Sequence, residues 1–180
     1  MENHTLICVI GDSQAGKSAL ITWAARQYFP ELRIIRSVTT RSRRSGESRE
    51  EFKLFYRRIA VSTFLERTKI GYFVEYDEYA GNWYGTAYQE LKTLQHSCGI
   101  QAVTEPAIPR LREMGIPVYV IRVERLAHSR QEISRERRQA DQLRRGTVTP
   151  DKVVPNDFSA GGFKRSCQRF GEIIEPLITG

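Results

Sequence analysis

Eight consecutive residues near the start of the chain form a phosphate-binding pattern. Residues 11–18 read GDSQAGKS, which fits G-x-x-x-x-G-K-[ST]. Glycines let backbone N–H groups turn inward around phosphate oxygens, and a helix that begins here adds the positive end of its dipole. Lys17 is expected to reach the β- and γ-phosphates of a triphosphate, and Ser18 to place its hydroxyl on Mg²⁺. The predicted triphosphate site comprises Gly11, Asp12, Ser13, Gln14, Ala15, Gly16, Lys17 and Ser18.

A second group of residues that could bind a substrate lies in the arginine-rich stretch that follows. Arg41 and Arg44 lie three positions apart within a polar segment, residues 39–51, which we expect to be an exposed loop. Guanidinium groups bind phosphate as planar, multidentate donors, so this pair could fix the phosphate of a second substrate. Most runs of charged residues are simply exposed to solvent, and of these three arginines we expect this for Arg43 only.

The elements that must position these residues alternate between apolar strands and amphipathic helices. Such alternation indicates a parallel sheet with helices on both faces. Strands are predicted at residues 6–10, 32–38, 99–103, 118–123 and 152–154, and helices at 17–28, 88–97, 106–114, 129–145 and 163–177.

The middle of the chain breaks this rhythm. A possible edge strand at 52–56 and a helix at 60–69 precede two extended runs around Gly81-Asn82, a hairpin signal. We therefore predict a small mixed insertion on an α/β frame, with Trp83 as one of its core aromatics.

Composition narrows the class of partner. The chain has 180 residues, which suits one domain, and 28 basic against 21 acidic residues give a formal charge of +7. Arginines crowd into 33–49 and 122–145, around the expected phosphate sites, which favours a polyanionic small substrate over nucleic acid or membrane. Three dispersed cysteines suggest no disulfide, and neither a signal segment nor a membrane span is evident, so we expect a cytoplasmic protein.

Three further motifs follow the phosphate loop in order. Residues 37–47 fit S-x-x-x-R-x-x-R-x-G-E, residues 81–86 read GNWYGT, and a final strand ends in Asn156-Asp157. With the loop, they make nearly the whole chain resemble the guanylate kinase family of P-loop nucleoside monophosphate kinases. The resemblance implies a P-loop three-layer α/β sandwich with a mainly parallel sheet, a small mixed β/α acceptor-binding insertion and a short helical lid. It also implies transfer of the γ-phosphoryl group of ATP to GMP or dGMP, with Mg²⁺.

The resemblance further assigns regions and residues within one domain, residues 1–180. The core would span about 1–36, 88–123 and 146–180, the insertion about 37–87 and the lid about 124–145. Glu75 would accept from the N1–H and 2-amino donors of guanine, hydroxyls would serve the remaining edge, and mismatched bases would leave polar groups unpaired. The implied acceptor-site residues are Ser37, Arg41, Arg44, Glu75, Tyr84, Thr86 and Gln101, and Asn156 joins the ATP site.

The chain departs from the family in three places. An aspartate pair is replaced by Gln101 and Val103, which removes charge from the metal surroundings, although Glu105 follows closely. The nearest match to a phosphate-contacting tyrosine is Phe52, which lacks the hydroxyl. The lid is shorter, and its candidate arginines are Arg130, Arg135, Arg137 and Arg138.

Among the lid arginines, Arg135 is the first candidate for contact with the transferred phosphoryl group and Arg138 the second. The alternative for this segment is a solvated charged helix held by pairs four residues apart.

Other functions remain open from sequence. The chain could be a kinase that resembles ribose 1,5-bisphosphate phosphokinase, or a catalytically weak guanylate kinase-like module that binds a phosphorylated protein. A nucleic-acid binder is the least favoured alternative. Our expectation is a small nucleotide substrate, no nucleic-acid or membrane partner, and a monomer or homodimer.

Overall fold

The computed structural model describes residues 5–94, 97–126 and 134–179. Its main sheet has five parallel strands, as the alternating pattern predicted. In spatial order they are β2 (Leu32–Ile34), β7 (Cys98–Ala102), β1 (Leu6–Ile10), β8 (Val118–Arg125) and β9 (Lys152–Asn156). Every residue of the central β1 is buried, which explains its unbroken apolar sequence.

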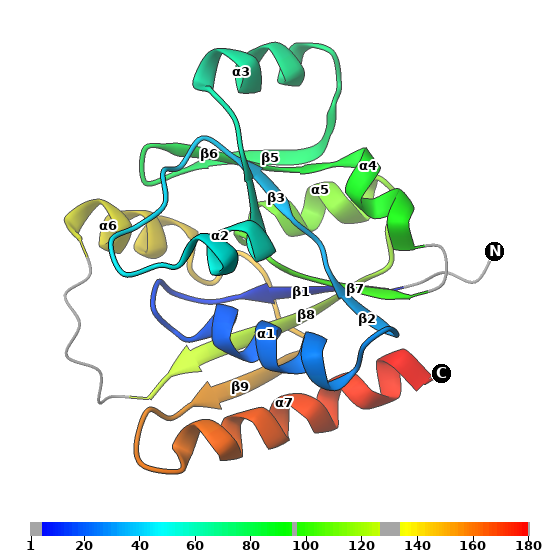
Figure 1. Ribbon diagram of the computed structural model, residues 1–180, viewed down its shortest axis with the longest axis vertical. Helices are drawn as coiled ribbons and strands as arrows, with labels where there is room; N and C mark the ends of the chain where they lie inside the picture. Colours follow the sequence, from blue (N-terminus) through cyan, green and yellow to red (C-terminus); the bar gives the residue numbers. More distant parts are fainter. Residues whose placement is uncertain (1–4, 95–96, 127–133, 180) are drawn as a thin grey trace.

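Helices cover both faces of this sheet (Figure 1). On one face, α1 (Lys17–Gln27) and α7 (Gly162–Thr179) pack on an apolar core that includes Leu20 and Phe170. On the other, α5 (Ala107–Glu113) packs through Ile108 and Leu111. Beside it lie α4 (Tyr88–Leu91) and the short helix η1 (Lys92–Leu94). The three-layer α/β sandwich expected from sequence is confirmed.

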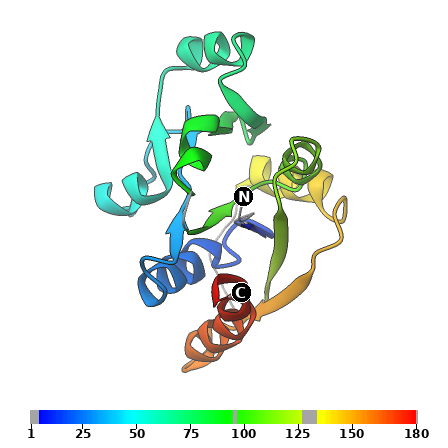
Figure 2. The same cartoon turned by 90° about the vertical axis from the view of Figure 1, so that its right-hand side faces the viewer.

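A second sheet of four strands stands apart from the first (Figure 2). Its strands, in the spatial order β4 (Tyr56–Arg58), β3 (Ser37–Thr39), β6 (Asn82–Ala87) and β5 (Phe73–Tyr79), pair in mixed directions. Helix α3 (Val61–Lys69) covers it with Phe64, which stacks on Phe73 at 4.5 Å between ring centroids. Trp83 packs against this small core, as predicted.

The segment assigned to the lid contains α6 (Arg135–Arg144). Ser134 caps its first turn by accepting a hydrogen bond from the backbone N–H of Arg137. Arg130 lies in 127–133, outside the described residues.

Two predicted strands were wrong in their bounds, for physical reasons. Residues 49–55 form helix α2 (Arg49–Phe55) instead of an exposed loop running into an edge strand, and β4 begins only at Tyr56. Ser48 accepts from the N–H of Glu51, and the pair has the Ser-x-x-Glu spacing of a helix start. The single strand predicted at 32–38 is two, because the chain leaves the parallel sheet after β2 and enters the mixed sheet at β3.

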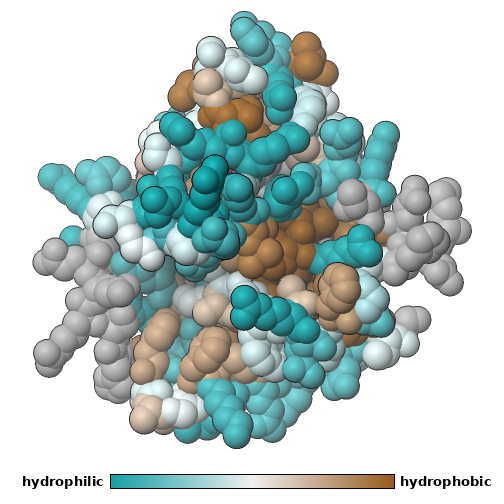
Figure 3. All heavy atoms as spheres, viewed as in Figure 1, coloured by the Kyte–Doolittle hydropathy of each residue, from teal (hydrophilic) through white to brown (hydrophobic). Residues whose placement is uncertain are grey.

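The exposed surface is mainly polar where α2 and α6 lie (Figure 3). None of the helices that the structure describes has the length and apolar character to cross a membrane.

Candidate nucleotide-binding site

The phosphate loop joins the central strand β1 to α1, where its sequence predicted it. Gly11 has φ 136° and Gly16 has φ 90°, both in the region that favours glycine. A Cβ at Gly11 would collide with the carbonyl of Val123, and one at Gly16 with the side-chain amide of Asn156. Close approach as well as conformation therefore requires glycine at both positions.

Lys17 lies across the loop that precedes it. Its Nζ donates to the carbonyls of Gly11 and Asp12, at 2.6 Å and 2.7 Å. Burial lowers the pKa of Lys17 to about 8, although the Asp141 and Asp12 carboxylates oppose this shift. The ammonium group is thus held at the mouth of the loop, while the next residue, Ser18, is exposed.

Asn156 supports the loop from the protein side. It is fully buried, and its Nδ2 donates to the carbonyl of Ala15 at 2.8 Å. Its Oδ1 has no hydrogen-bond partner within the described part of the chain. The structure therefore places Asn156 against the backbone of the loop.

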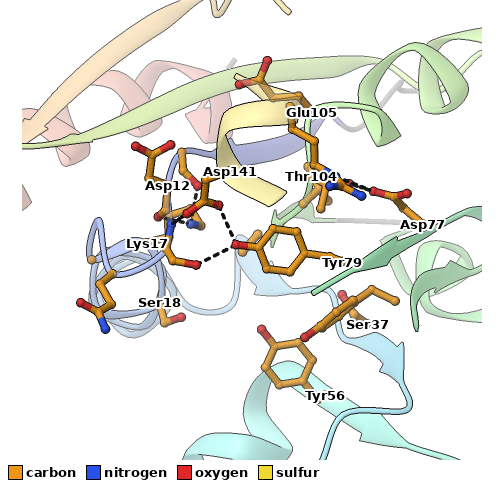
Figure 4. Close-up of a pocket in the computed structure, with 18 of the residues that line it drawn as sticks. Asp12, Lys17, Ser18, Ser37, Tyr56, Asp77, Tyr79, Thr104, Glu105 and Asp141 are labelled. Carbon is orange, nitrogen blue, oxygen red and sulfur yellow. Dashed lines mark hydrogen bonds and ion pairs between the residues drawn. The ribbon is translucent and has the colours of Figure 1, made fainter. Parts of the chain in front are cut away.

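One cavity of about 370 Å³ extends from the phosphate loop to the mixed sheet (Figure 4). Most of the loop lines it, together with Ser37, Arg44, Glu75 and Tyr84 from the predicted acceptor residues. Several residues that sequence reasoning did not select also line it: Glu51, Tyr56, Asp77, Tyr79, Thr104, Glu105, Asp141, Arg144 and Arg145. Donor and acceptor predictions thus meet in one continuous space.

A buried polar cluster closes the far end of this cavity. Ser37, Glu75, Thr86 and Gln101 come from β3, β5, β6 and β7. The Thr86 hydroxyl donates to Glu75 Oε1 at 2.5 Å, and Gln101 Nε2 lies 3.0 Å from Ser37 Oγ and 2.9 Å from Thr86 Oγ1. Burial raises the pKa of Glu75 to about 7, although the bond from Thr86 lowers it. All four residues proposed for the base edge are neighbours.

The arginine stretch divides into three environments. Arg41 is 5% exposed and forms a two-bond ion pair with Glu47, at 2.9 Å and 3.0 Å. Arg43 is exposed and donates to the carbonyl of Glu47. Arg44 is also exposed, contrary to expectation, but it lines the cavity, where partial burial of its guanidinium and the like charges of Arg41 and Arg137 lower its pKa. The expectation that 39–51 is exposed is therefore wrong for Arg41.

Aromatic rings form the wall beside these arginines. The guanidinium of Arg41 lies over the rings of Phe52 and Tyr56, 5.0 Å and 4.7 Å from their centroids. Tyr56 lines the cavity next to Tyr84, with 6.1 Å between ring centroids. A phenol is thus present in the cavity wall after all, at Tyr56 instead of Phe52. The capping pattern at Ser48 is the signal that would have moved the start of the strand to this residue.

Helix α6 contacts both halves of the cavity through residues that sequence reasoning missed. Asp141 Oδ2 accepts from the backbone N–H of Ser13 at 3.0 Å, and its Oδ1 accepts from the Tyr79 hydroxyl at 2.6 Å (Figure 4). The Tyr79 hydroxyl also lies 2.7 Å from Ser13 Oγ. Burial and the bond to Asp141 raise the pKa of Tyr79. Asp141 thus holds one N–H of the loop where phosphate oxygens are expected to bind.

Two arginines at the end of α6 complete these contacts. Arg144 Nε donates to Asp77 Oδ2 at 3.1 Å, and Arg145 pairs with Asp12. The predicted lid residues Arg135 and Arg138 are exposed on the same helix and are not among the residues that line the cavity. The structure therefore brings different arginines of this segment to the loop.

Glu105 has a structural environment. It pairs with Arg122 at 2.8 Å and accepts from the backbone N–H of Val148 at 3.0 Å and the Thr147 hydroxyl at 3.1 Å. Burial acts to raise the pKa of Glu105, but Arg122 and these donors lower it. Its oxygens are committed to Arg122 of β8 and to the segment after α6. Among the residues described, no three His, Cys, Asp or Glu side chains gather as a metal site.

A phosphate loop after the central strand of a parallel sheet, facing a separate small sheet across one cavity, defines a P-loop α/β protein. No protein-family model matches the chain. The guanylate kinase of Rubrobacter xylanophilus is 29% identical over 193 aligned residues, which span 100% of this chain and 98% of that protein. The guanylate kinase of a Nostoc species is 42% identical over 81 residues, 45% of this chain and 39% of that protein.

The fold has a counterpart among solved structures. A crystal structure of guanylate kinase from Anaplasma phagocytophilum matches with a TM-score of 0.68 and 18% identity, over 100% of this chain and 89% of that chain. The chain is therefore similar in sequence to guanylate kinases over its full length, and it shares the fold of a solved guanylate kinase.

Proposed function

We propose that this protein transfers the γ-phosphoryl group of ATP to the phosphate of GMP or dGMP, yielding ADP and the nucleoside diphosphate. The observation that carries the proposal is the single cavity that joins the phosphate loop to Arg44, Glu75 and Ser37. Two nucleotides in one cavity can react directly, because the acceptor phosphate needs only to be held in line with the γ-phosphorus. No covalent enzyme intermediate is required.

The donor half holds the triphosphate. Backbone N–H groups of residues 11–18 bind phosphate oxygens, and the Lys17 ammonium neutralises charge at the β- and γ-phosphates. The triphosphate displaces the Gly11 and Asp12 carbonyls from Lys17 and the Asp141 carboxylate from Ser13. Arg144 and Arg145 line the cavity, so they are the arginines of this segment that we expect to stabilise the charge on the transferred phosphoryl group.

The acceptor half holds the nucleoside monophosphate at both ends. Burial and the like charges of Arg41 and Arg137 lower the pKa of Arg44. A dianionic phosphate between these groups would relieve that repulsion. The Tyr56 and Tyr84 hydroxyls add neutral donors to the same wall. At the other end, Glu75 and Ser37 contact the base.

Mg²⁺ fits this site as a partner of the triphosphate. Ser18 is exposed at the first turn of α1, where its hydroxyl can bind the ion, and phosphate oxygens and water would supply the other ligands. The ion would spread the negative charge of the β- and γ-phosphates. The chain's own residues hold and orient the two nucleotides.

A turnover assay tests the proposal. ATP and Mg²⁺ are offered with GMP, dGMP, AMP or ribose 1,5-bisphosphate, and nucleoside diphosphate formation is followed by chromatography. Phosphorylation of GMP or dGMP, with little of AMP, is expected. Phosphorylation of the sugar alone would show a different kinase, and phosphopeptide binding without any turnover would show a binding module.

A further inference from the structure

One strand of the mixed sheet runs along the cavity from its closed end to the phosphate loop. Side chains alternate across a strand, so Glu75, Asp77 and Tyr79 of β5 face the same side, and all three line the cavity. Glu75 belongs to the polar cluster at the closed end, and the Tyr79 hydroxyl lies 2.7 Å from Ser13 Oγ of the loop. Asp77 therefore lies between the acceptor end and the donor end of the cavity.

The Asp77 carboxylate holds an arginine of α6 at this point. Its Oδ2 accepts from Arg144 Nε at 3.1 Å, and also at 3.1 Å from the hydroxyl of Thr104, which follows β7 (Figure 4). The side chains of Asp77 and Arg144 are only 18% and 21% exposed, so solvent screens their attraction less than that of a surface pair. Arg145, in its pair with Asp12, is 62% exposed. Arg144 is therefore the more firmly held of the two.

The contacts of Arg144 leave part of its guanidinium for a ligand. A guanidinium carries five N–H donors in a planar fork. One donates to Asp77, one on Nη1 to the carbonyl of Ala140 at 3.3 Å, and one on Nη2 to the carbonyl of Glu78. The group also lies over the ring of Tyr79, 5.4 Å from its centroid. Counting partners among the described residues, one N–H remains on each terminal nitrogen, on a side chain that lines the cavity.

We propose that Asp77 is a positioning residue that directs Arg144 onto the phosphoryl group during transfer; this inference rests on the proposed function and deepens it. In that step an oxygen of the acceptor phosphate forms a bond to the γ-phosphorus. The bond from this phosphorus to the β–γ bridging oxygen breaks, and its electron pair leaves with ADP. Negative charge is then shared between the two nucleotides, where the two remaining N–H groups of Arg144 can donate to it.

The carboxylate acts through the arginine and has no favourable contact of its own with phosphate. Alone, Asp77 would repel the phosphates, because both are negatively charged. An arginine side chain has many rotamers, and holding it in one during the reaction would slow the reaction about tenfold. With Asp77 in place this entropy is lost when the chain folds, so the guanidinium is already aimed when charge develops.

The test compares Asp77→Ala, Arg144→Met and the double variant in the GMP assay, with kcat and both KM values measured. Arg144→Met should lower kcat about 10- to 100-fold, because a charge-assisted donor is lost, and Asp77→Ala about tenfold. Both KM values should change less than about twofold, since the contact is made in the transition state. The double variant should be no slower than Arg144→Met, because Asp77 acts through that arginine.

A conservative variant and two controls separate positioning from a general loss of structure. Asp77→Asn keeps an oxygen acceptor for Arg144 Nε and should recover most of the kcat that Asp77→Ala loses. Glu66→Ala, at an exposed position of α3, and Arg169→Met, at an exposed position of α7, remove the same charges elsewhere and should leave kcat unchanged. Thermal melts of every variant establish that it is folded.

Two results would overturn the inference: unchanged kcat in a folded Asp77→Ala, or losses that multiply in the double variant. If Asp77→Ala does not fold, Asp77→Asn replaces it in the same comparison with Arg144→Met. The wild-type protein decides the proposed function separately. Phosphorylation of ribose 1,5-bisphosphate alone would overturn only the proposed function, and the variants would then be compared on the sugar. Absence of turnover with every acceptor would overturn both.

Discussion

The two halves of the cavity differ in how they are built. The donor half consists of contiguous residues, 11–18, whose backbone conformation and one lysine form the site. The acceptor half draws Ser37, Glu75, Thr86 and Gln101 from four strands in two sheets. A phosphate is common to all nucleotides and can be held by backbone groups, whereas a base is distinguished by the polarity of particular side chains. Changes in the two halves should therefore have separable effects.

The halves also differ in the charge that they bury. Burial lowers the pKa of Lys17 to about 8 and raises that of Glu75 to about 7. Each buried charge is disfavoured until a complementary ligand arrives: a polyphosphate for the ammonium and an N–H edge for the carboxylate. Both groups keep their ionised form available near neutral pH.

Among substitutions in the donor half, replacement of Lys17 should have the largest effect on turnover. Lys17→Met should lower kcat about 10²–10³-fold, because a donor aimed at the developing phosphate charge is removed. GMP affinity, measured by calorimetry, should stay unchanged, since Lys17 is not part of the base-edge cluster. Lys69→Met, at an exposed position of α3, is the control. Equal kcat for Lys17→Met and wild type would contradict the assignment.

In the acceptor half, Glu75→Gln should raise KM for GMP about ten- to a hundredfold, since a charged acceptor of two base donors is lost. KM for ATP should not move. Glu78→Gln removes a carboxylate from an exposed position of the same strand and is the matched control. An equal rise of both KM values would show that the two halves are not separable.

The same substitution should make the fold more stable at alkaline pH. The pKa of Glu75 rises from 4.5 in the unfolded chain to about 7 in the folded one, so its ionisation opposes folding, increasingly as pH climbs through this interval. Glu75→Gln removes this cost, which is about 3 kcal/mol above pH 7. Thermal melts should show a higher Tm for the variant at pH 8 and nearly equal values at pH 4.5. A lower Tm at pH 8 would contradict this account.

The pH dependence should separate the halves without any mutation. Glu75 must be ionised to accept from the base, so kcat/KM for GMP should fall about tenfold per pH unit below pH 7. Lys17 must be protonated, so kcat/KM for ATP should fall above about pH 8. Each profile is measured with the other substrate saturating. In Glu75→Gln the acidic limb should disappear; its persistence would assign that limb to another group.

Local patterns predicted the donor half because the phosphate loop is contiguous and lies between a strand and a helix. The fold class followed from the same alternation. The base-edge residues come from distant strands, and only the family resemblance pointed to them as one group. In the structure they lie side by side, which agrees with that resemblance. Their hydrogen-bond directions depend on three-dimensional contacts, which no spacing in the sequence reveals.

Sequence reasoning failed where local and tertiary signals competed. Residues 52–56 were expected to form an edge strand, but the capping pair Ser48 and Glu51 starts a helix there, and the strand begins only at the cavity residue Tyr56. In α6, the sequence analysis selected arginines as the residues that act on the phosphates, but Asp141 is the residue that bonds to the phosphate loop. Nothing in the sequence around a single aspartate in a charged helix indicates such a long-range contact.

Substitution of Asp141 should give the smallest effect of those predicted for the two halves of the cavity. This residue contacts both halves. Its carboxylate accepts from Ser13 of the loop and from Tyr79 of β5, so an incoming triphosphate must displace a negative charge. Asp141→Asn should lower KM for ATP about fivefold and leave KM for GMP unchanged, because a like charge is removed at nearly constant shape. Glu136→Gln removes one charge from an exposed position of the same helix and controls for long-range effects. A higher KM for ATP in Asp141→Asn would instead mean that this carboxylate supports the bound MgATP, and that the donor half has recruited from the lid the acidic group missing at Gln101 and Val103.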